Sequence, residues 1–166
     1  MFRKIRNPFA GMSGYDCFGC SPDNPIGLRL NFVDEGEYLT ATWIPEDHFQ
    51  GYHDLLHGGI QSTLMDEIAS WFVYVKIKTA GVTSRLEVKY KKPVLINKGA
   101  IKLRAKLISQ RRNLVDIEVE LFDNEGQLCA HGIVQYFTFS EKLSKEKYFY
   151  PDSGDFYFEK GEEEMK

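Results

Sequence analysis

The chain has 166 residues, of which 43% are hydrophobic and 27% charged, and its formal net charge is −3. This length and composition predict one globular domain with a sizeable core. The slightly acidic charge argues against a basic surface for nucleic acid, so we do not expect a nucleic-acid partner.

The sequence carries no sign of a membrane segment. No apolar run approaches the ~18–20 residues that span a bilayer, and the basic start, residues 1–6, has no apolar segment behind it that would make a secretory signal. The three cysteines are an odd number and do not suggest a disulfide framework. We therefore expect a cytoplasmic protein without a membrane partner.

Residues 1–27 read as an irregular N-terminal arm, because Asn-Pro, Ser-Pro and several glycines punctuate them. Residues 28–33 and 38–44 then alternate between apolar and polar side chains. Gly36 lies in the short polar segment between them, which predicts a β-hairpin.

A long helix is predicted over residues 59–79, after a polar and aromatic loop at 45–56. Its apolar residues recur at helical spacing and are Ile60, Leu64, Ile68, Phe72 and Val75. Ala80 and Gly81 are expected to end the helix. A helix that is apolar on most sides favours enclosure by a sheet or by a partner subunit.

Four further strands are predicted, because the period changes to two over 82–92, 100–109, 114–122 and 128–139. Two strands, one helix and four strands indicate an α+β domain at 28–139, with an antiparallel sheet curled around a single helix.

Residues 140–166 form a predicted C-terminal tail with two aromatic triplets, 148–150 and 156–158, set among charges. So many aromatic residues are unusual for a disordered segment, so we expect them to pack on the domain or on a neighbouring subunit. The acidic end, 159–166, is expected to be frayed.

The chemistry of the chain is concentrated at His57-Gly58-Gly59 and at Asp66 in the helix that follows. Paired glycines at a helix start leave backbone N–H groups open to a ligand oxygen, and the helix dipole favours negative charge there. Asp66 lies on a narrow polar stripe with Ser62 and Ser70. From spacing alone it is either a functional acid or an ordinary acid facing solvent.

Cys17 and Cys20 form a C-x-x-C pair, but the neighbouring sequence offers no further ligands at metal spacing, and Cys129 is alone in a strand. A redox pair would require a βαβ context that the pattern lacks. We therefore expect local packing of the arm and no metal.

Three motifs in this order resemble one family. They are Cys17-Phe18-Gly19-Cys20 with Asn24-Pro25-Ile26-Gly27-Leu28, then His57-Gly58-Gly59 with Asp66 nine residues after the histidine, then Thr83 seven residues before Tyr90-Lys91-Lys92-Pro93. Over roughly residues 15–139 the chain resembles hotdog-fold acyl-CoA thioesterases of the phenylacetate-pathway type and their mammalian relatives. The resemblance implies a hotdog fold, a curved antiparallel sheet wrapped around one long central helix.

The resemblance also implies hydrolysis of acyl-CoA to the free acid and coenzyme A, with no cofactor beyond the coenzyme A of the substrate. The N–H of Gly58, with that of Gly59, would polarise the thioester carbonyl. Asp66 would act as base or nucleophile, and Thr83 would orient the water or carboxylate unless it is a plain β-former. His57 is expected to shape the turn.

About 10 Å, two helical turns, separates Asp66 from the N-terminus of its own helix. The family solves this by pairing two protomers with antiparallel helices, so that Asp66 of one chain faces Gly58 of the other. We therefore expect a homodimer, with pairing of dimers into a tetramer as an extension.

Candidate substrate-binding residues follow the same resemblance. Gln50 stands beside Gly51, where some relatives carry an amide side chain, and could replace it. Ile60 and Leu64, with Trp71 and Phe72, are expected to line the acyl pocket. Lys91 and Lys92, with Lys89, Arg111 and Arg112, either bind the coenzyme A phosphates or form a solvated sheet face.

Two other functions stay open on the same fold. The first is a non-catalytic module that binds acyl thioesters, which Gly51 in place of an amide would favour. The second is a hydratase or dehydratase, which requires a histidine paired with an acid. His48, His53 and His131 are available, but none lies in a recognisable motif.

Overall fold

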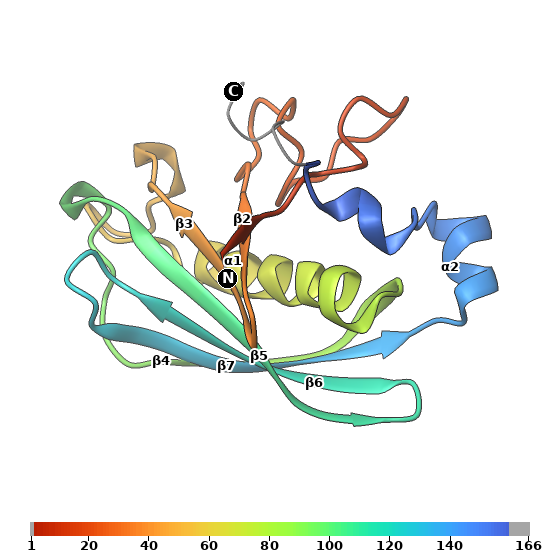
Figure 1. Cartoon of the computed structure of the whole chain (residues 1–166). Coiled ribbons are helices and arrows are strands. Elements are labelled where there is room, and N and C mark those ends of the chain that lie inside the picture. Colours follow the sequence, from red (N-terminus) through yellow and green to blue (C-terminus); the bar gives the residue numbers. More distant parts are fainter. Residues whose placement is uncertain (1, 160–166) are drawn as a thin grey trace.

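The structure, a computed structural model, describes residues 2–159 and contains one seven-stranded antiparallel sheet that curves around a long helix (Figure 1). The strands are β1 (Arg3–Lys4), β2 (Phe32–Glu35), β3 (Tyr38–Trp43), β4 (Gly81–Tyr90), β5 (Ile101–Arg111), β6 (Leu114–Phe122) and β7 (Leu128–Thr138). Their order in the sheet is β1-β2-β3-β5-β6-β7-β4. The predicted α+β architecture is confirmed, and the arm adds β1 at one edge.

The helices are α1 (Gly58–Phe72), which continues as a π-helical turn at Val73–Ile77, and α2 (Glu141–Tyr148). Short 3-10 turns occupy Asp47–Phe49, Ile96–Lys98 and Ser153–Phe156. Within residues 2–159, no helix combines the length and the apolar character needed to cross a membrane.

The core lies between α1 and the concave face of the sheet. Alternate side chains of β6 point to the helix and have 0% exposure, namely Val115, Ile117, Val119 and Leu121. Leu64, Met65 and Ile68 of α1 meet them and are equally buried. Burying each such side chain contributes about 1.5–3 kcal/mol to folding, and this packing fixes the rotation of α1 above the sheet.

Two predicted boundaries are wrong for reasons of hydrogen bonding. The first strand of the hairpin begins at Phe32 and not at residue 28. The N–H groups of Leu28 and Leu30 donate instead to Phe18 O and Gly19 O of the arm, at 2.7 and 2.9 Å, and Arg29 between them has a φ of 52°. The alternation of side chains predicted a strand here, but the backbone bonds to the N-terminal arm and follows the arm instead.

The long helix also ends earlier than predicted. Lys78 takes the left-handed conformation, with a φ of 63°, directly after the π-helical turn. Gly81 is already the first residue of β4. Ala80, expected in the helix cap, is buried, and its N–H donates to Ser144 Oγ at 3.2 Å.

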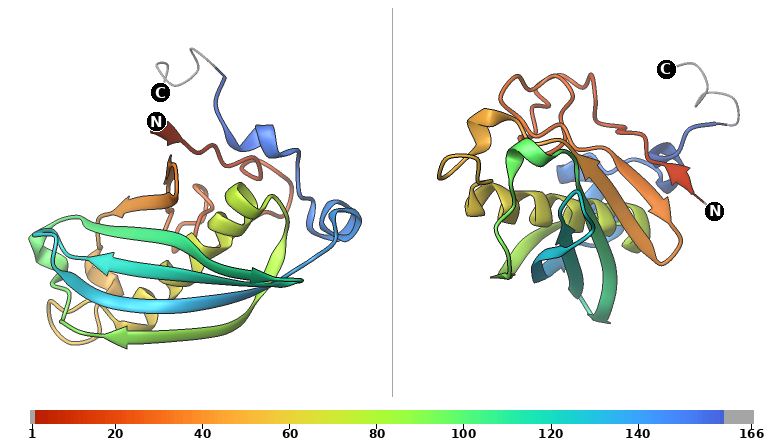
Figure 2. Two further views of the ribbon diagram at one scale, coloured as in Figure 1. Left: turned by 60° about the horizontal axis from the view of Figure 1, so that its bottom comes forward. Right: turned by 90° about the vertical axis from the view of Figure 1, so that its left-hand side faces the viewer.

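The N-terminal arm and the C-terminal segment cover the side of α1 that faces away from the sheet (Figures 1 and 2). Phe156 has 0% exposure and packs against Phe9, Trp71 and Tyr74. Tyr150 donates its hydroxyl to Tyr74 O at 2.9 Å. Aromatic residues of the tail therefore pack on their own chain. The predicted frayed acidic end lies, from residue 160 on, outside the described residues.

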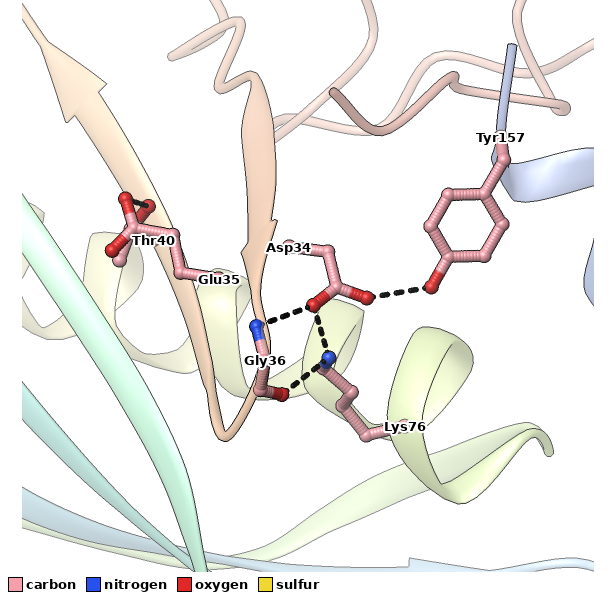
Figure 3. A network of polar contacts seen from close by, with 6 residues as sticks. All are labelled: Asp34, Glu35, Gly36, Thr40, Lys76 and Tyr157. Atoms are coloured by element: carbon pink, nitrogen blue, oxygen red, sulfur yellow. Dashed lines mark hydrogen bonds and ion pairs between the residues drawn. The ribbon is translucent and has the colours of Figure 1, made fainter. Parts of the chain in front are cut away.

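Asp34 joins three distant parts of the chain (Figure 3). Its carboxylate accepts hydrogen bonds from the Gly36 N–H at 2.9 Å, from the Tyr157 hydroxyl at 2.7 Å and from Lys76 Nζ. Lys76 also donates to Gly36 O at 2.8 Å. The β2–β3 turn, the end of the long helix and the C-terminal segment therefore meet at one carboxylate.

Protonating Asp34 should release this contact. Burial raises the pKa of Asp34, but hydrogen bonds from Lys76 and Tyr157 outweigh burial and leave the pKa lower than normal. A lowered folded pKa gives stability that is present above the unfolded pKa of about 3.9 and is lost as pH falls through the folded value. Asp34→Asn should therefore lower the melting temperature at pH 7 and change it little at the acid end.

Thermal unfolding followed by circular dichroism from pH 7 to pH 3 measures this difference. Asp23→Asn, a change at an exposed acid, is the matched control and should leave the curve unchanged. Equal destabilisation by Asp34→Asn across the whole pH range would contradict the assignment.

Candidate active site

The first turn of α1 begins with backbone N–H groups that have no partner inside the helix, and two of them belong to Gly58 and Gly59. His57 is the N-cap, and its Nδ1 accepts the Gly59 N–H at 2.9 Å. The ring therefore carries no proton on Nδ1 and acts as a cap, which agrees with the turn-shaping role expected for His57. The Gly58 N–H makes no hydrogen bond within the described chain. Gly59 was expected as a second donor, but His57 already uses its N–H.

Tyr90, at the end of β4, holds this turn in place. Its hydroxyl donates to Gly58 O at 2.7 Å and lies 2.6 Å from Ser62 Oγ. The phenol ring runs alongside Gly58, since a Cβ there would be 3.6 Å from the ring Cζ. The edge strand thus holds the residue that carries the open donor, through the carbonyl of Gly58.

A cleft of about 690 Å³ opens beside the Gly58 turn. Its lining includes Gln50, His57, Gly58, Tyr90, Lys91 and Lys92. Three predicted substrate-binding residues, Gln50 and the two lysines, therefore lie together at the donor. Gln50 Oε1 accepts the Asp54 N–H at 3.2 Å, and Lys92 Nζ donates to Gln127 Oε1 at 2.6 Å.

The predicted acyl-pocket residues lie elsewhere in a single protomer. Leu64 has 0% exposure and belongs to the core, and Trp71 and Phe72 are buried with it at 1% and 3%. Ile60 is partly buried against the same core. None of the four lines the cleft.

Arg111 and Arg112 lie at the opposite end of the sheet from the cleft. They occupy the β5–β6 turn next to Leu114, which pairs with Phe137 of β7, whereas Tyr90 at the cleft pairs with Ala130. Seven residues of strand separate those two positions on β7, or about 23 Å. The two arginines therefore do not contribute to this cleft within one protomer.

Asp66 is held by two hydroxyl groups. Thr83 Oγ1 donates to Asp66 Oδ1 at 2.8 Å, and the Tyr136 hydroxyl donates to the same oxygen at 3.0 Å and to Asp66 O at 3.1 Å. Oδ2 accepts no hydrogen bond from the residues that the structure describes. The carboxylate is thus oriented through one oxygen, and the other remains available.

The sheet explains why these hydroxyls converge. Thr83 of β4 and Tyr136 of β7 are directly paired, and the register between the two strands shifts immediately after Thr83. A bulge of this kind re-aims the side chain beside it. Burial and the nearby Asp66 carboxylate raise the pKa of Tyr136, so its hydroxyl keeps its proton and stays a donor.

Sequence reasoning identified Thr83 but missed Tyr136. The available signal was weak: residues 130, 132, 134, 136 and 138 of β7 face α1, and only tyrosine among them has a side chain long enough to reach the helix with a hydroxyl. The pattern alone did not single out Asp66 as its partner.

The histidines needed for a hydratase are elsewhere. His131 lies 2.9 Å from Glu118, and both side chains are on strands β7 and β6. His53 is next to Asp54, and His48 next to Glu46, on the loop before α1. No histidine forms a hydrogen bond or ion pair with Asp66 in residues 2–159.

The part of the chain that carries these residues matches known proteins. The family described as thioesterase superfamily matches residues 53–130, which include Gly58, Asp66 and Thr83 and stop before Tyr136. A protein of Saccharolobus solfataricus described as a candidate esterase is 28% identical over 124 residues, or 74% of this chain and 80% of that protein.

Solved structures share the fold. A thioesterase superfamily protein superposes with a TM-score of 0.65 at 20% identity over 73% of this chain, which spans 62% of that protein's chain. A Streptococcus mutans protein solved with acetyl-CoA superposes with a TM-score of 0.63 at 18% identity, over 78% of this chain and 97% of its own.

Proposed function

We propose that this chain, whose residues 53–130 match the thioesterase superfamily and whose fold is shared by solved thioesterase structures, hydrolyses acyl-CoA thioesters to the free acid and coenzyme A. The observation that carries the proposal is that the chain contains two oriented groups, each with an atom available to a substrate. One is the open Gly58 N–H at the start of α1, and the other is the Asp66 carboxylate held through Oδ1 with Oδ2 free.

The chemistry requires charge stabilisation at the carbonyl oxygen. The Gly58 N–H donates to that oxygen and the positive end of the α1 dipole faces it, so the developing oxyanion is stabilised where it forms. Asp66 Oδ2 either takes a proton from the attacking water or attacks the carbonyl carbon itself. The carbon–sulfur bond then breaks, and coenzyme A leaves as the thiol after gaining a proton.

Two protomers are needed to bring these groups together. Gly58 and Asp66 are eight residues apart on one straight helix, a separation of about 12 Å, and Asp66 does not line the cleft of its own chain. In the proposed homodimer, the Asp66 of one protomer completes the Gly58 cleft of its partner. A monomer would lack a complete site.

The edge strand β4 supports this pairing. Val82, Leu86 and Tyr90 are 44%, 38% and 51% exposed along it. A long edge strand with exposed apolar side chains is a site of pairing with another chain, and a twofold axis places two such strands against each other. Because β4 also carries Thr83 and Tyr90, the same contact would assemble both halves of the site.

Coenzyme A would enter through the cleft. Lys91 and Lys92 at its rim offer positive charge to the phosphates, and the fold neighbour from Streptococcus mutans was solved with acetyl-CoA bound. Gln50 lines the cleft from the loop before α1 and would hold the thioester or the water.

The test is release of free thiol from a panel of short, medium, long and aromatic acyl-CoAs. We expect turnover with at least one acyl class and much less with the matching oxygen esters, because the thiolate is the better leaving group. Binding of acyl-CoA without turnover on any substrate would instead favour the non-catalytic module, with Gly51 in place of an amide as its cause.

A further inference from the structure

A second cluster of reactive side chains lies on another face of α1, under the N-terminal arm. Cys17, Cys20 and Glu67 bring their two sulfurs and a carboxylate oxygen within 4.8 Å of one another. Cys17 Sγ is 3.6 Å from Glu67 Oε1. Glu67 follows Asp66 directly, and the ~100° turn per residue of a helix sends the two acids in different directions.

The Cys17–Cys20 turn is built around the Glu67 carboxylate. A Cβ at Gly19 would fall 2.3 Å from the Glu67 carboxyl carbon, so the carboxylate rests directly against Gly19, and a larger residue there would push it aside. Ser21 N donates to Cys17 O at 3.1 Å and closes the turn.

The arm holds this turn on the helix. The backbone bonds from Leu28 to Phe18 and from Leu30 to Gly19 are the ones that replaced the predicted strand. They fix two of the three peptides that join the two cysteines. The two sulfurs therefore belong to a loop that backbone hydrogen bonds hold against α1.

The cluster lacks a positive charge. Within residues 2–159, the Glu67 carboxylate forms no ion pair with a lysine, arginine or histidine, and its side-chain donors are Trp71 Nε1 at 3.1 Å and Cys17. A divalent cation supplies that charge and uses all three groups.

We propose that Cys17, Cys20 and Glu67 form a zinc site that fastens the N-terminal arm to α1. Zinc accepts thiolate and carboxylate ligands at about 2.3 and 2.0–2.2 Å in tetrahedral geometry, so ligand atoms within 4.8 Å of one another need only a small contraction. Binding displaces the two thiol protons into solvent. Sulfur ligands select zinc over magnesium and calcium, which prefer oxygen.

Cys17, Cys20 and Glu67 all line a pocket of about 580 Å³, which would leave room for water as a fourth ligand. Aromatic side chains line much of this pocket, including Phe9, Tyr15, Tyr74 and Phe149. The Tyr15 hydroxyl lies 2.9 Å from Cys20 Sγ and accepts from Asn7 Nδ2 at 3.1 Å. Tyr15 is therefore the outer partner that orients one ligand.

The C-x-x-C pair has no further ligands nearby in the sequence, and for that reason no metal was expected. The spacing of residues in the sequence could not identify Glu67 as a ligand, because Glu67 belongs to a helix far along the chain from the two cysteines. Only the packing of the arm on α1 brings the third ligand to the two sulfurs.

The experiment uses the full chain, reduced and metal-free, titrated with cobalt(II) and then with zinc under inert gas. We expect one cobalt per chain, with a thiolate-to-cobalt charge-transfer band and the visible spectrum of tetrahedral cobalt, and displacement by one zinc. An outer partner of a metal ligand typically accounts for about 10–100-fold of the affinity, so Tyr15→Phe should weaken zinc binding by about 10-fold and each ligand variant by more than 100-fold.

Glu67→Gln is the decisive variant, since it keeps the side-chain volume and the acceptor for Trp71 if a cysteine variant fails to fold. Cys129→Ala removes the remaining cysteine and should bind zinc like the unchanged chain. The proposal is overturned by a reduced chain that gives no charge-transfer band, or by zinc binding that is the same in Glu67→Gln and the unchanged chain. A Cys17–Cys20 disulfide with no metal uptake after reduction overturns it as well.

Discussion

Replacing Asp66 by Asn should lower kcat by about 10²–10⁴-fold, the contribution typical of a positioned base, while acyl-CoA still binds. The fold should survive because both hydroxyl donors, Thr83 and Tyr136, use Oδ1. Asparagine offers the same oxygen and changes only the second atom. That atom is the one left free, so the substitution isolates the chemical role.

The measurement is thiol release together with acyl-CoA binding by calorimetry. Asp116→Asn is the matched control, because Asp116 alternates with the inward residues of β6 and hydrogen-bonds Ser109 and Gln135 away from Asp66. It should keep normal turnover. Full activity in Asp66→Asn would remove Asp66 from the mechanism.

The same active chain separates the two roles of Asp66. In water enriched with ¹⁸O, direct attack forms an acyl anhydride on Asp66, and water that attacks the Asp66 carbonyl carbon of that anhydride leaves heavy oxygen in the Asp66 carboxylate. A base that activates water leaves heavy oxygen in the product acid alone. Heavy oxygen in the peptide that carries Asp66, found by mass spectrometry after many turnovers, would therefore establish direct attack.

The elements that could be predicted from sequence are those in which local pattern and packing agree. Strand β6 was predicted with its observed bounds because its inward residues are all apolar and those between them are mostly polar. Residues 28–31 also alternate, yet they bond to the arm, because a strand exists only where a partner strand is present. Periodicity indicates which side chains face a core, but it does not indicate which segment the backbone will bond to.

The candidate site divides in the same way. The contact between Asp66 and Thr83 was predicted because a resemblance supplied the pairing, and the structure contains it. Tyr136 and Glu67 needed contacts between elements distant in the sequence. Gly59 was misjudged because the capping bond to His57 depends on the side-chain rotamer, which a motif does not reveal.

Gly58→Pro should reduce turnover by about 10²–10³-fold or more, the effect of losing one oxyanion donor. Proline has no N–H, and it is tolerated at the first helical position, which Gly58 occupies. His57 before it has a φ of −59° and a ψ of 132°, which suit a residue preceding proline. The proline ring also fills the space of the carbonyl oxygen, so both effects act in the same direction.

Gly58→Ala is the matched control for this change. Its N–H remains, and its Cβ would lie 3.6 Å from Tyr90 Cζ, an ordinary contact. It should therefore retain most of the activity, and both variants should show the helical content of the unchanged chain. Similar losses in the two variants would point to crowding of the turn and away from a lost donor.

Mixing the two inactive variants tests whether the site is shared. A heterodimer of Asp66→Asn and Gly58→Pro has one site with both defects and one with neither, if Gly58 of one protomer works with Asp66 of its partner. After unfolding and refolding together at equal amounts, half of the dimers are mixed, so activity should return to about a quarter of normal. Each variant refolded alone is the control and should stay inactive. A mixture that stays inactive, while mass spectrometry detects the heterodimer, would show that Gly58 and Asp66 must be intact in the same chain. That result would contradict a shared site.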